Sequence, residues 1–336
     1  YSALAANTTG DDNTAVGKEA LTANTTGTQN VAIGISALLV NTTGSHNVAV
    51  GKGALDVNTT ASYNTGVGYN AMGSNSTGAY NSAFGNSALK ANTTADYNAA
   101  LGHYALYNNT TGASNTAVGA NALDANTTGT QNTAVGRHSL SAITTAGDNT
   151  AIGYYSGSSM TTGQQNTALG TQAMHLATTG SYNTAVGCYA LDAAVTGSSN
   201  VAVGHQALSL NTSGGSNVAI GKEALEANTT ADHNTAVGAV ALHVNTTGTH
   251  NQAVGNYALQ QCTTGSYNIG IGYNTLGGVT TESNNVAIGD AALESCTASS
   301  NVAIGFNALY SNTTGTRNTA VGAFALDANT TANDNT

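Results

Sequence analysis

The sequence predicts an all-β protein, a parallel β-solenoid built from short repeats. Three observations support this fold class. A 17-residue motif recurs along the whole chain of 336 residues. Val, Ile and Leu recur at fixed places in the motif, and a Gly directly follows the first apolar place in every complete repeat. Proline is absent, as expected where inner strands donate their N–H groups to neighbouring turns.

The repeat reads N-T-A-V-G-x-x-A-L-x-x-N-T-T-G-x-x, and its leading Asn is position 1 throughout. That residue is Asn13 in the first complete repeat and recurs in steps of 17 as far as Asn285, then at Asn301, Asn318 and Asn335. Position 5 is Gly in all nineteen complete repeats. We therefore predict about twenty turns in a single continuous array over residues 1–336, which we expect to be a segment of a longer chain.

The strands are placed by the one irregular repeat. The repeat that begins at Asn285 has 16 residues, yet Asn301, Val302 and Ile304 resume the pattern. A deletion inside a strand would turn every later side chain to the opposite face. We therefore expect the lost residue to lie in a turn between positions 12 and 17, and strands at roughly positions 1–5 and 7–11.

Charged residues separate the outside of each turn from the inside. Of the 22 Asp, Glu, Lys and Arg residues, 21 occupy positions 6, 7, 10, 16 and 17, which we interpret as solvent-facing corners. Position 12 is mostly Asn, but it is replaced by Ile143, Met160, Ala177, Ala194, Cys262, Val279 and Cys296. These substitutions indicate an inward-facing site, where Asn side chains would bond to one another from turn to turn.

The candidate structural residues follow from these assignments. They are the position-1 residues Asn13, Asn30, Asn47 and Asn64, the position-5 residues Gly17, Gly34, Gly51 and Gly68, and the position-12 residues Asn24, Asn41, Asn58 and Asn126. A Gly in every repeat is expected at a left-handed or crowded turn that a Cβ would obstruct. The N-T-T sequons that begin at position 12 are not expected to carry glycans, because that side chain points inward.

Oligomerisation is predicted from adjacent restricted positions. Positions 3 and 4 accept only small or apolar residues, and so do positions 8 and 9. Neighbouring residues of a strand point to opposite faces, so both faces are expected to be buried. We infer that several chains pack around a common axis as a homo-oligomer.

The repeats resemble a known family. N-T-A-V-G at 13–17, N-V-A-I-G at 30–34 and N-V-A-V-G at 47–51 resemble the signature of the head domains of trimeric autotransporter adhesins. The longer phrase A-L-x-x-N-T-T-G-x-x-N-T-A-V-G is similar to repeats of tail-fibre-domain proteins. The resemblance implies a left-handed parallel β-roll, three intertwined chains, and a role as a surface adhesin or fibre shaft.

No catalytic, cofactor-binding or metal-binding residues are expected. All eight His residues occupy corner positions, and no Ser or Cys stands out from the repeat as a nucleophile. His233 and His250 stack at position 17 in successive turns, but a third metal ligand is missing. Cys262 and Cys296 are interpreted as buried replacements for Asn, and Cys188 at position 6 as an exposed thiol.

The partners are constrained by charge. Only six Lys and Arg residues are present and the net charge is −10, which argues against binding to nucleic acid or to anionic membranes. No apolar run is long enough to span a bilayer, so no membrane insertion is expected. Tyr63, Tyr80 and Tyr97 stack at position 17 and are a candidate contact surface for sugars or proteins.

The sequence therefore predicts a non-enzymatic extracellular structural protein, a rigid fibre or adhesin-head shaft on a cell or virion surface. Its expected partners are further copies of itself, as a homotrimer and as an end-to-end filament, together with a host surface, glycan or matrix. The alternative is an ice-binding β-solenoid that uses rows of Thr at positions 2, 13 and 14. Thermal hysteresis distinguishes the two functions.

Overall fold

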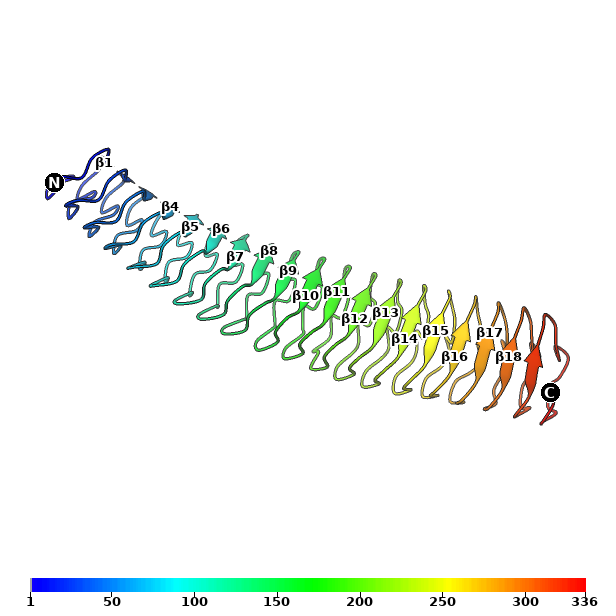
Figure 1. Cartoon of the computed structure of the whole chain (residues 1–336). Helices are drawn as coiled ribbons and strands as arrows, with labels where there is room; N and C mark the ends of the chain where they lie inside the picture. The colour runs from blue at the N-terminus through cyan, green and yellow to red at the C-terminus, as the bar shows by residue number, and fades with distance from the viewer. Residues whose placement is uncertain (1) are drawn as a thin grey trace. The chain divides into compact units, whose positions relative to one another are not determined.

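The computed structural model describes residues 2–336, and every regular element in this range is a β-strand. The chain forms two compact units, one ending at Asn166 and the other beginning at Thr167. The first unit contains β1 Thr14–Val16, β2 Val31–Ile33, β3 Val48–Val50, β4 Thr65–Val67, β5 Ser82–Phe84, β6 Ala99–Leu101, β7 Thr116–Val118, β8 Thr133–Val135 and β9 Thr150–Ile152 (Figure 1).

The second unit has the same organisation. It contains β10 Thr167–Leu169, β11 Thr184–Val186, β12 Val201–Val203, β13 Val218–Ile220, β14 Thr235–Val237, β15 Gln252–Val254, β16 Ile269–Ile271, β17 Val286–Ile288, β18 Val302–Ile304 and β19 Thr319–Val321. Each strand is three residues long and covers positions 2 to 4 of its repeat.

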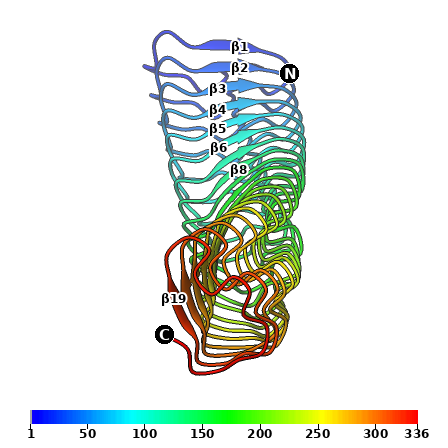
Figure 2. The same cartoon turned by 90° about the vertical axis from the view of Figure 1, so that its right-hand side faces the viewer.

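Within each unit the strands pair in parallel with the strand one turn away. Ala15 of β1 pairs with Ala32 of β2, and Ala168 of β10 pairs with Ala185 of β11, so the register advances by one repeat. Figure 2 shows β1 to β6 stacked one above another on the same side of their turns. Both units are parallel β-solenoids with a 17-residue period, and the predicted fold class is confirmed.

The interior of each turn is narrow and is filled by small and medium side chains. The Ala at position 3 of the repeat, in the middle of the strand, points inward. The Ala and Leu at positions 8 and 9 are buried with it, as Ala32, Ala37 and Leu38 illustrate. No large aromatic side chain is buried among the described residues. The core is therefore one thin column of Ala and Leu, repeated in each turn.

The glycine at position 5 is required by close approach of the backbone. Gly68 has a φ of +136°, and a Cβ placed on it would meet the carbonyl oxygen of Gly85 at 2.3 Å. Gly17, Gly34 and Gly51 have φ angles of +130°, +136° and +134° and the same close neighbour one turn on. Any larger residue here would push successive turns apart, which accounts for Gly in every repeat.

The predicted second strand at positions 7–11 is wrong. In its place the chain turns, because positions 7 and 9 adopt left-handed backbone conformations, although all but Gly53 and Gly157 of these residues are not Gly. Glu19 and Leu21 have φ angles of 60° and 51°. The alternation of left-handed residues brings two neighbours, Ala20 and Leu21, to the same interior, where both are fully buried.

This conformation also corrects the argument from adjacent restricted positions. Positions 8 and 9 are both buried by their own chain, so they say nothing about partners. Positions 3 and 4 behave as strand residues should. The Ala at position 3 points inward, and the residue at position 4 points outward. Of positions 3, 4, 8 and 9, only position 4 holds an apolar side chain that its own chain does not cover.

Two columns of Asn side chains connect the turns. At position 12, Asn24 donates from Nδ2 to Oδ1 of Asn7 at 2.8 Å and to the carbonyl of Gly27 at 3.0 Å. Asn41, Asn58 and Asn126 make the corresponding pair of bonds. The predicted ladder of buried Asn side chains at position 12 is therefore present.

The asparagines at position 1 form the second column. The Oδ1 of Asn30 accepts from the backbone N–H of Asn47 at 3.0 Å, and Nδ2 of Asn30 donates to the carbonyl of Gly44 at 2.9 Å. Asn13 and Asn64 make the same bonds in their turns. Each side chain thus satisfies polar backbone groups that the short strands leave unpaired.

The position-12 ladder stops where the next turn carries another residue. The Oδ1 atoms of Asn126 and Asn245 are buried without a hydrogen-bond partner, because the next turns carry Ile143 and Cys262. One predicted inward residue is wrong: Ala194 is exposed, and Val195 beside it is fully buried. The bulkier side chain fills the interior and the chain shifts locally by one residue.

The short repeat is absorbed where the sequence placed it. The strands on either side remain in register, since Val286 pairs with Val302 and Ile288 with Ile304. Thr297 Oγ1 still donates to the carbonyl of Thr313, both at position 13, at 3.0 Å. The missing residue is therefore at position 14, in the turn.

Candidate functional site

In each unit, the outward face of the strands carries a column of apolar side chains. These side chains, together called the outer stripe, are the position-4 residues Val16, Ile33, Val50, Val67, Phe84, Leu101, Val118, Val135 and Ile152 in the first unit and Leu169, Val186, Val203, Ile220, Val237, Val254, Ile271, Ile288, Ile304 and Val321 in the second. None is buried. Away from the chain ends, the most exposed of these side chains are between 37% exposed, at Ile304, and 51% exposed, at Leu101.

The stripe is free of charge and continues beyond the strand. No Asp, Glu, Lys or Arg occupies positions 1 to 5 of any repeat. At position 6 the exposed apolar residues Ile35, Tyr69, Tyr154, Tyr273 and Phe306 extend the surface. A contiguous exposed apolar surface of this kind marks an interaction site in soluble proteins.

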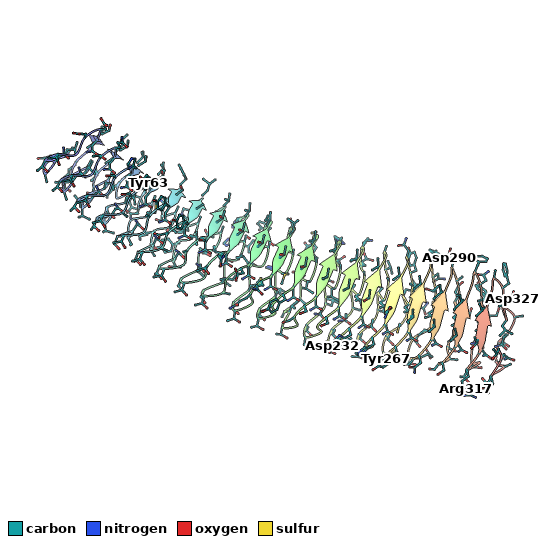
Figure 3. The ribbon with its side chains drawn as sticks, in the orientation of Figure 1. Tyr63, Asp232, Tyr267, Asp290, Arg317 and Asp327 are labelled. Atoms are coloured by element: carbon teal, nitrogen blue, oxygen red, sulfur yellow. The ribbon has the colours of Figure 1, made fainter. Side chains whose placement is uncertain are left out.

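Charges at positions 6 and 10 of the repeat differ in sign. Position 6 holds Lys18, Lys52, Arg137, Lys222 and Asp290, so four of its five charges are positive. Position 10 holds Lys90 and six acidic residues, Asp56, Asp124, Asp192, Glu226, Glu294 and Asp327. In the second unit, Figure 3 shows Asp290 at one edge of the turns and Tyr267 and Arg317 at the opposite edge. The charges at position 6 therefore form a mostly basic rim and those at position 10 a mostly acidic rim, and a basic and an acidic residue occupy both positions of one turn at Lys52 with Asp56 and at Lys222 with Glu226.

The acidic rim is less exposed than the sequence predicted. The Oδ1 atoms of Asp56 and Asp192 are buried without a hydrogen-bond partner. Burial raises the pKa of both carboxyl groups above the usual value, and it raises the pKa of Asp124 as well. Position 10 is thus a half-buried site and not a fully solvated corner.

The predicted aromatic contact residues form a stack. The ring centroids of Tyr63 and Tyr80 are 5.1 Å apart, those of Tyr80 and Tyr97 are 5.2 Å apart, and His46 continues the stack 4.7 Å from Tyr63. The rings are nearly parallel, with interplanar angles of 4° and 8° between the tyrosines. Their faces therefore cover one another, and their edges and hydroxyl groups are presented to solvent.

The two histidines singled out by the sequence are neighbours with their rings tilted by 39°, and no third ligand joins them among the described residues. The ring centroids of His233 and His250 are 4.9 Å apart, and the next ring in the column is Tyr267. A different group, Glu223, Glu226 and His243, brings three ligand atoms within 4.8 Å of one another. Sequence reasoning missed it, although aligning successive turns places Glu226 and His243 together at position 10.

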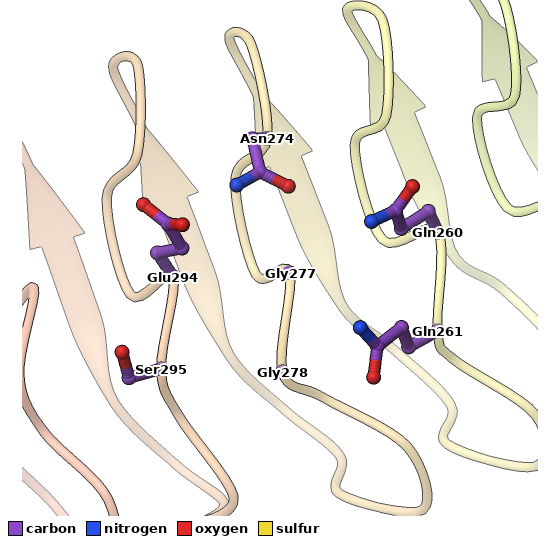
Figure 4. Close-up of a pocket in the computed structure, with 7 residues that line it drawn as sticks. All are labelled: Gln260, Gln261, Asn274, Gly277, Gly278, Glu294 and Ser295. Atoms are coloured by element: carbon purple, nitrogen blue, oxygen red, sulfur yellow. The ribbon is translucent and has the colours of Figure 1, made fainter.

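A polar cavity of about 230 Å³ lies in the second unit. Figure 4 shows why it forms: Gly277 and Gly278 occupy positions 10 and 11 of one turn, and the turns on either side keep their side chains there. Its lining residues are Gln260, Gln261, Asn274, Gly277, Gly278, Glu294 and Ser295. The cavity is a gap in a column of surface side chains, open to solvent.

The cysteines are arranged as the sequence predicted, with one difference. Cys262 and Cys296 are fully buried and Cys188 is half-buried; no disulfide joins them. Burial raises the pKa of Cys262 to about 12 and also raises the pKa of Cys296. Both thiols therefore remain protonated at neutral pH and act as small apolar side chains.

No protein-family model matches the chain, and no curated protein matches it. Among residues 2–336 there is no helix with the length and apolar character that a membrane span requires.

Proposed function

We propose that the protein is a non-enzymatic, extracellular structural protein, a rigid fibre or adhesin-head shaft that assembles with copies of itself through the outer stripe. The observation that carries this proposal is the outer stripe: an exposed or half-exposed Val, Ile, Leu or Phe follows the inward-facing small residue, Ala or in two strands Gly, in every strand of both units. Solvent alone would not restrict these positions to apolar residues. A protein partner that repeats with the same spacing would restrict them in this way.

The size of the effect supports self-association. Covering one aliphatic side chain fully is worth about 1.5–3 kcal/mol, so covering the exposed parts of the outer stripe sums to on the order of 10 kcal/mol. Association costs about 4–15 kcal/mol in lost freedom of motion. The stripe therefore offsets this cost roughly by itself, and the apolar residues at position 6 add to it.

Three-fold assembly is supported by two further features. The basic rim at position 6 and the acidic rim at position 10 are different surfaces, and an interface that joins two different surfaces closes into a ring of three or more chains, unlike the interface of a two-fold dimer. The resemblance of N-V-A-I-G at 30–34 to trimeric autotransporter adhesin heads implies the same number of chains, a left-handed roll and a location on a cell or virion surface. We propose a homotrimer on these grounds.

The oligomer is tested by sedimentation equilibrium of the purified chain. We expect the mass of three 33.2 kDa chains. Replacing Val118, Val135 and Ile152 by Lys places three charges on the outer stripe and should give monomers. The matched control replaces Thr128, Thr145 and Thr162 by Lys, at exposed position 14 of the same turns, and should stay trimeric. A monomeric wild type, or equal dissociation of both variants, would overturn the proposal.

Contact with a host surface, glycan or matrix is proposed for the Tyr63, Tyr80 and Tyr97 stack. Since the faces of these rings are stacked on one another, the available groups are ring edges and hydroxyls, which suit hydrogen bonding to sugars or proteins. Glycan-array binding by the wild type and its loss on replacing all three by Ala is the expected result. Unchanged binding would assign the contact elsewhere.

A second candidate function is ice binding, and one observation favours it. The Thr residues at position 14, for example Thr26, Thr43 and Thr60, are exposed in successive turns, and their hydroxyls have no partner within residues 2–336. The neighbouring Thr25 instead donates its hydroxyl to the carbonyl of Thr42. Thermal hysteresis of the purified chain, abolished by Thr43→Lys with Thr60→Lys, would favour this function over a structural one.

A further inference from the structure

Two successive turns of the second unit bring two carboxylates and one imidazole together. Glu223 and Glu226 occupy positions 7 and 10 of one turn, and His243 occupies position 10 of the next. Their ligand atoms all lie within 4.8 Å of one another, and all three side chains are half-buried. Of the residues described, only these gather three metal-ligating groups.

The distances fit a single bound ion. Nδ1 of His243 lies 3.2 Å from Oε2 of Glu226 and 3.3 Å from the carbonyl oxygen of Glu223. Zinc lies about 2.0–2.2 Å from nitrogen and oxygen ligands, so two ligands of one ion are roughly 3–3.5 Å apart. Glu226 and His243 already have this spacing, and the Glu223 carboxylate reaches it by rotation of its side chain.

The charge at this place is balanced by a residue that can move away. Nζ of Lys222 lies 3.0 Å from Oε1 of Glu223 and is the nearest cation. Its side chain is 63% exposed, so it is held by little besides this ion pair. A divalent ion would replace Lys222 as the partner of Glu223, and Lys222 therefore competes with the metal.

We propose that Glu223, Glu226 and His243 bind a divalent transition metal ion of the Zn²⁺ type, which joins two turns of the solenoid. An imidazole nitrogen with two carboxylates suits Zn²⁺, Ni²⁺ or Cu²⁺, whereas Mg²⁺ and Ca²⁺ prefer oxygen ligands throughout. The ligands come from turns 17 residues apart, so bound metal stabilises the folded chain.

Calorimetric titration of the metal-free full chain with ZnCl₂ tests the site. We expect one Zn²⁺ per chain, and no comparable heat with MgCl₂. Removing a residue that only hydrogen-bonds to a metal ligand already lowers metal affinity 10–100-fold. His243→Gln and Glu226→Gln each remove a ligand itself, so each should weaken Zn²⁺ binding by at least about tenfold. Lys222→Gln should strengthen it, because the competing cation is gone. Zn²⁺ should raise the melting temperature of the wild type and not that of His243→Gln.

His250→Gln is the matched control, because it removes another histidine, whose ring centroid lies 4.9 Å from that of His233. It should leave Zn²⁺ affinity unchanged. The proposal is overturned if His250→Gln abolishes binding while His243→Gln does not, if Lys222→Gln weakens binding, or if the wild type binds no Zn²⁺. Far-ultraviolet circular dichroism of each variant checks that the solenoid is intact.

Discussion

Buried amide side chains hold the turns together residue by residue. The Nδ2 of Asn126 donates to Oδ1 of Asn109 at 2.8 Å and to the carbonyl of Gly129 at 3.0 Å, in a fully buried position. A side-chain amide is suited to this place because its nitrogen supplies two donors at once, one to the neighbouring turn and one to its own. A carboxylate of the same shape has no such donors.

Asn126→Asp should therefore destabilise the protein at neutral pH by about 1–3 kcal/mol or more, since two buried acceptors lose their donors and a charge is buried. Urea unfolding followed by circular dichroism measures the difference. The same change at exposed Asn86, whose Oδ1 only accepts a hydrogen bond from Ser87, should stay within about 0.5 kcal/mol. Equal effects would contradict the inside and outside assignments.

Asp56 introduces a pH dependence at the same scale. Burial raises its pKa in the folded chain above the usual 3.8, and its Oδ1 lacks a hydrogen-bond partner. The folded state thus holds the proton more tightly than the unfolded state. This contribution to stability is complete below pH 3.8 and is lost as the pH rises through the folded pKa.

Asp56→Asn should therefore raise the melting temperature at pH 7, and the gain should shrink towards zero below pH 3.8. Melting curves from pH 3 to pH 7 measure it. Asp148→Asn, at an exposed position 17, is the control and should show a small difference that does not change in this way. The difference in melting temperature between Asp56→Asn and wild type should be larger at pH 7 than at pH 3. A smaller difference at pH 7 would contradict the burial of the Asp56 carboxylate.

At the scale of one turn, two glycines two residues apart have opposite requirements. Gly66 lies in β4 at position 3 of its repeat, where nearly every other turn has Ala. A Cβ added to Gly66 would lie 3.3 Å or more from its nearest neighbours. Gly68 at position 5 has a φ of +136° and the backbone of Gly85 at 2.3 Å. Gly at position 3 is therefore replaceable by Ala, whereas Gly at position 5, just after the strand, is required.

Gly66→Ala should stabilise the protein by about 0.4–1 kcal/mol, because Ala restricts the unfolded chain without strain. Gly68→Ala should destabilise it by at least about 1–3 kcal/mol, because a Cβ at this φ both strains the backbone and meets the next turn. Thermal melting of the two variants side by side measures both. A tolerated Gly68→Ala would mean that the turns can separate at position 5.

Deletions test which part of the turn tolerates a change in length. The 16-residue repeat lacks position 14 and keeps β17 and β18 in register. Deleting Thr314, at that same position, should leave a folded protein, whereas deleting Ala303 from β18 should shift its partners and expose apolar residues. Proteolysis rates and melting curves measure both, and equal damage would contradict the strand placement.

For the molecule as a whole, the period and the small interior residues predicted most of the fold. The Gly at position 5, the inward Ala and Leu, and the Asn columns could all be inferred from which residues each position accepts. The second strand could not, because left-handed conformations at Leu21 and Glu19 are uncommon for such residues and leave no compositional signal. The order of Ala194 and Val195 depends on packing, which a fixed repeat position does not report.

The candidate surfaces were predicted less completely for a similar reason. The apolar residues of the outer stripe were recognised, but only the structure separates them from Leu21-type residues that their own chain buries. The group of Glu223, Glu226 and His243 depends on side chains that meet across two turns, and no single repeat contains it. Contacts between turns are where periodic reasoning loses information, because each residue is compared with its column and not with its diagonal neighbours.

Stability that arises between neighbouring turns implies that a part of the array folds without the rest. The first unit, ending at Asn166, has its own paired strands β1 to β9, its own Asn columns and a continuous part of the outer stripe. A chain of residues 1–166 should therefore show the far-ultraviolet spectrum of the full protein, melt at a lower temperature, and form oligomers with the same number of chains. Circular dichroism and sedimentation equilibrium measure these properties. A disordered fragment would show that stability depends on interactions beyond nearest turns, and a folded monomer would show that the first half of the outer stripe does not suffice for assembly.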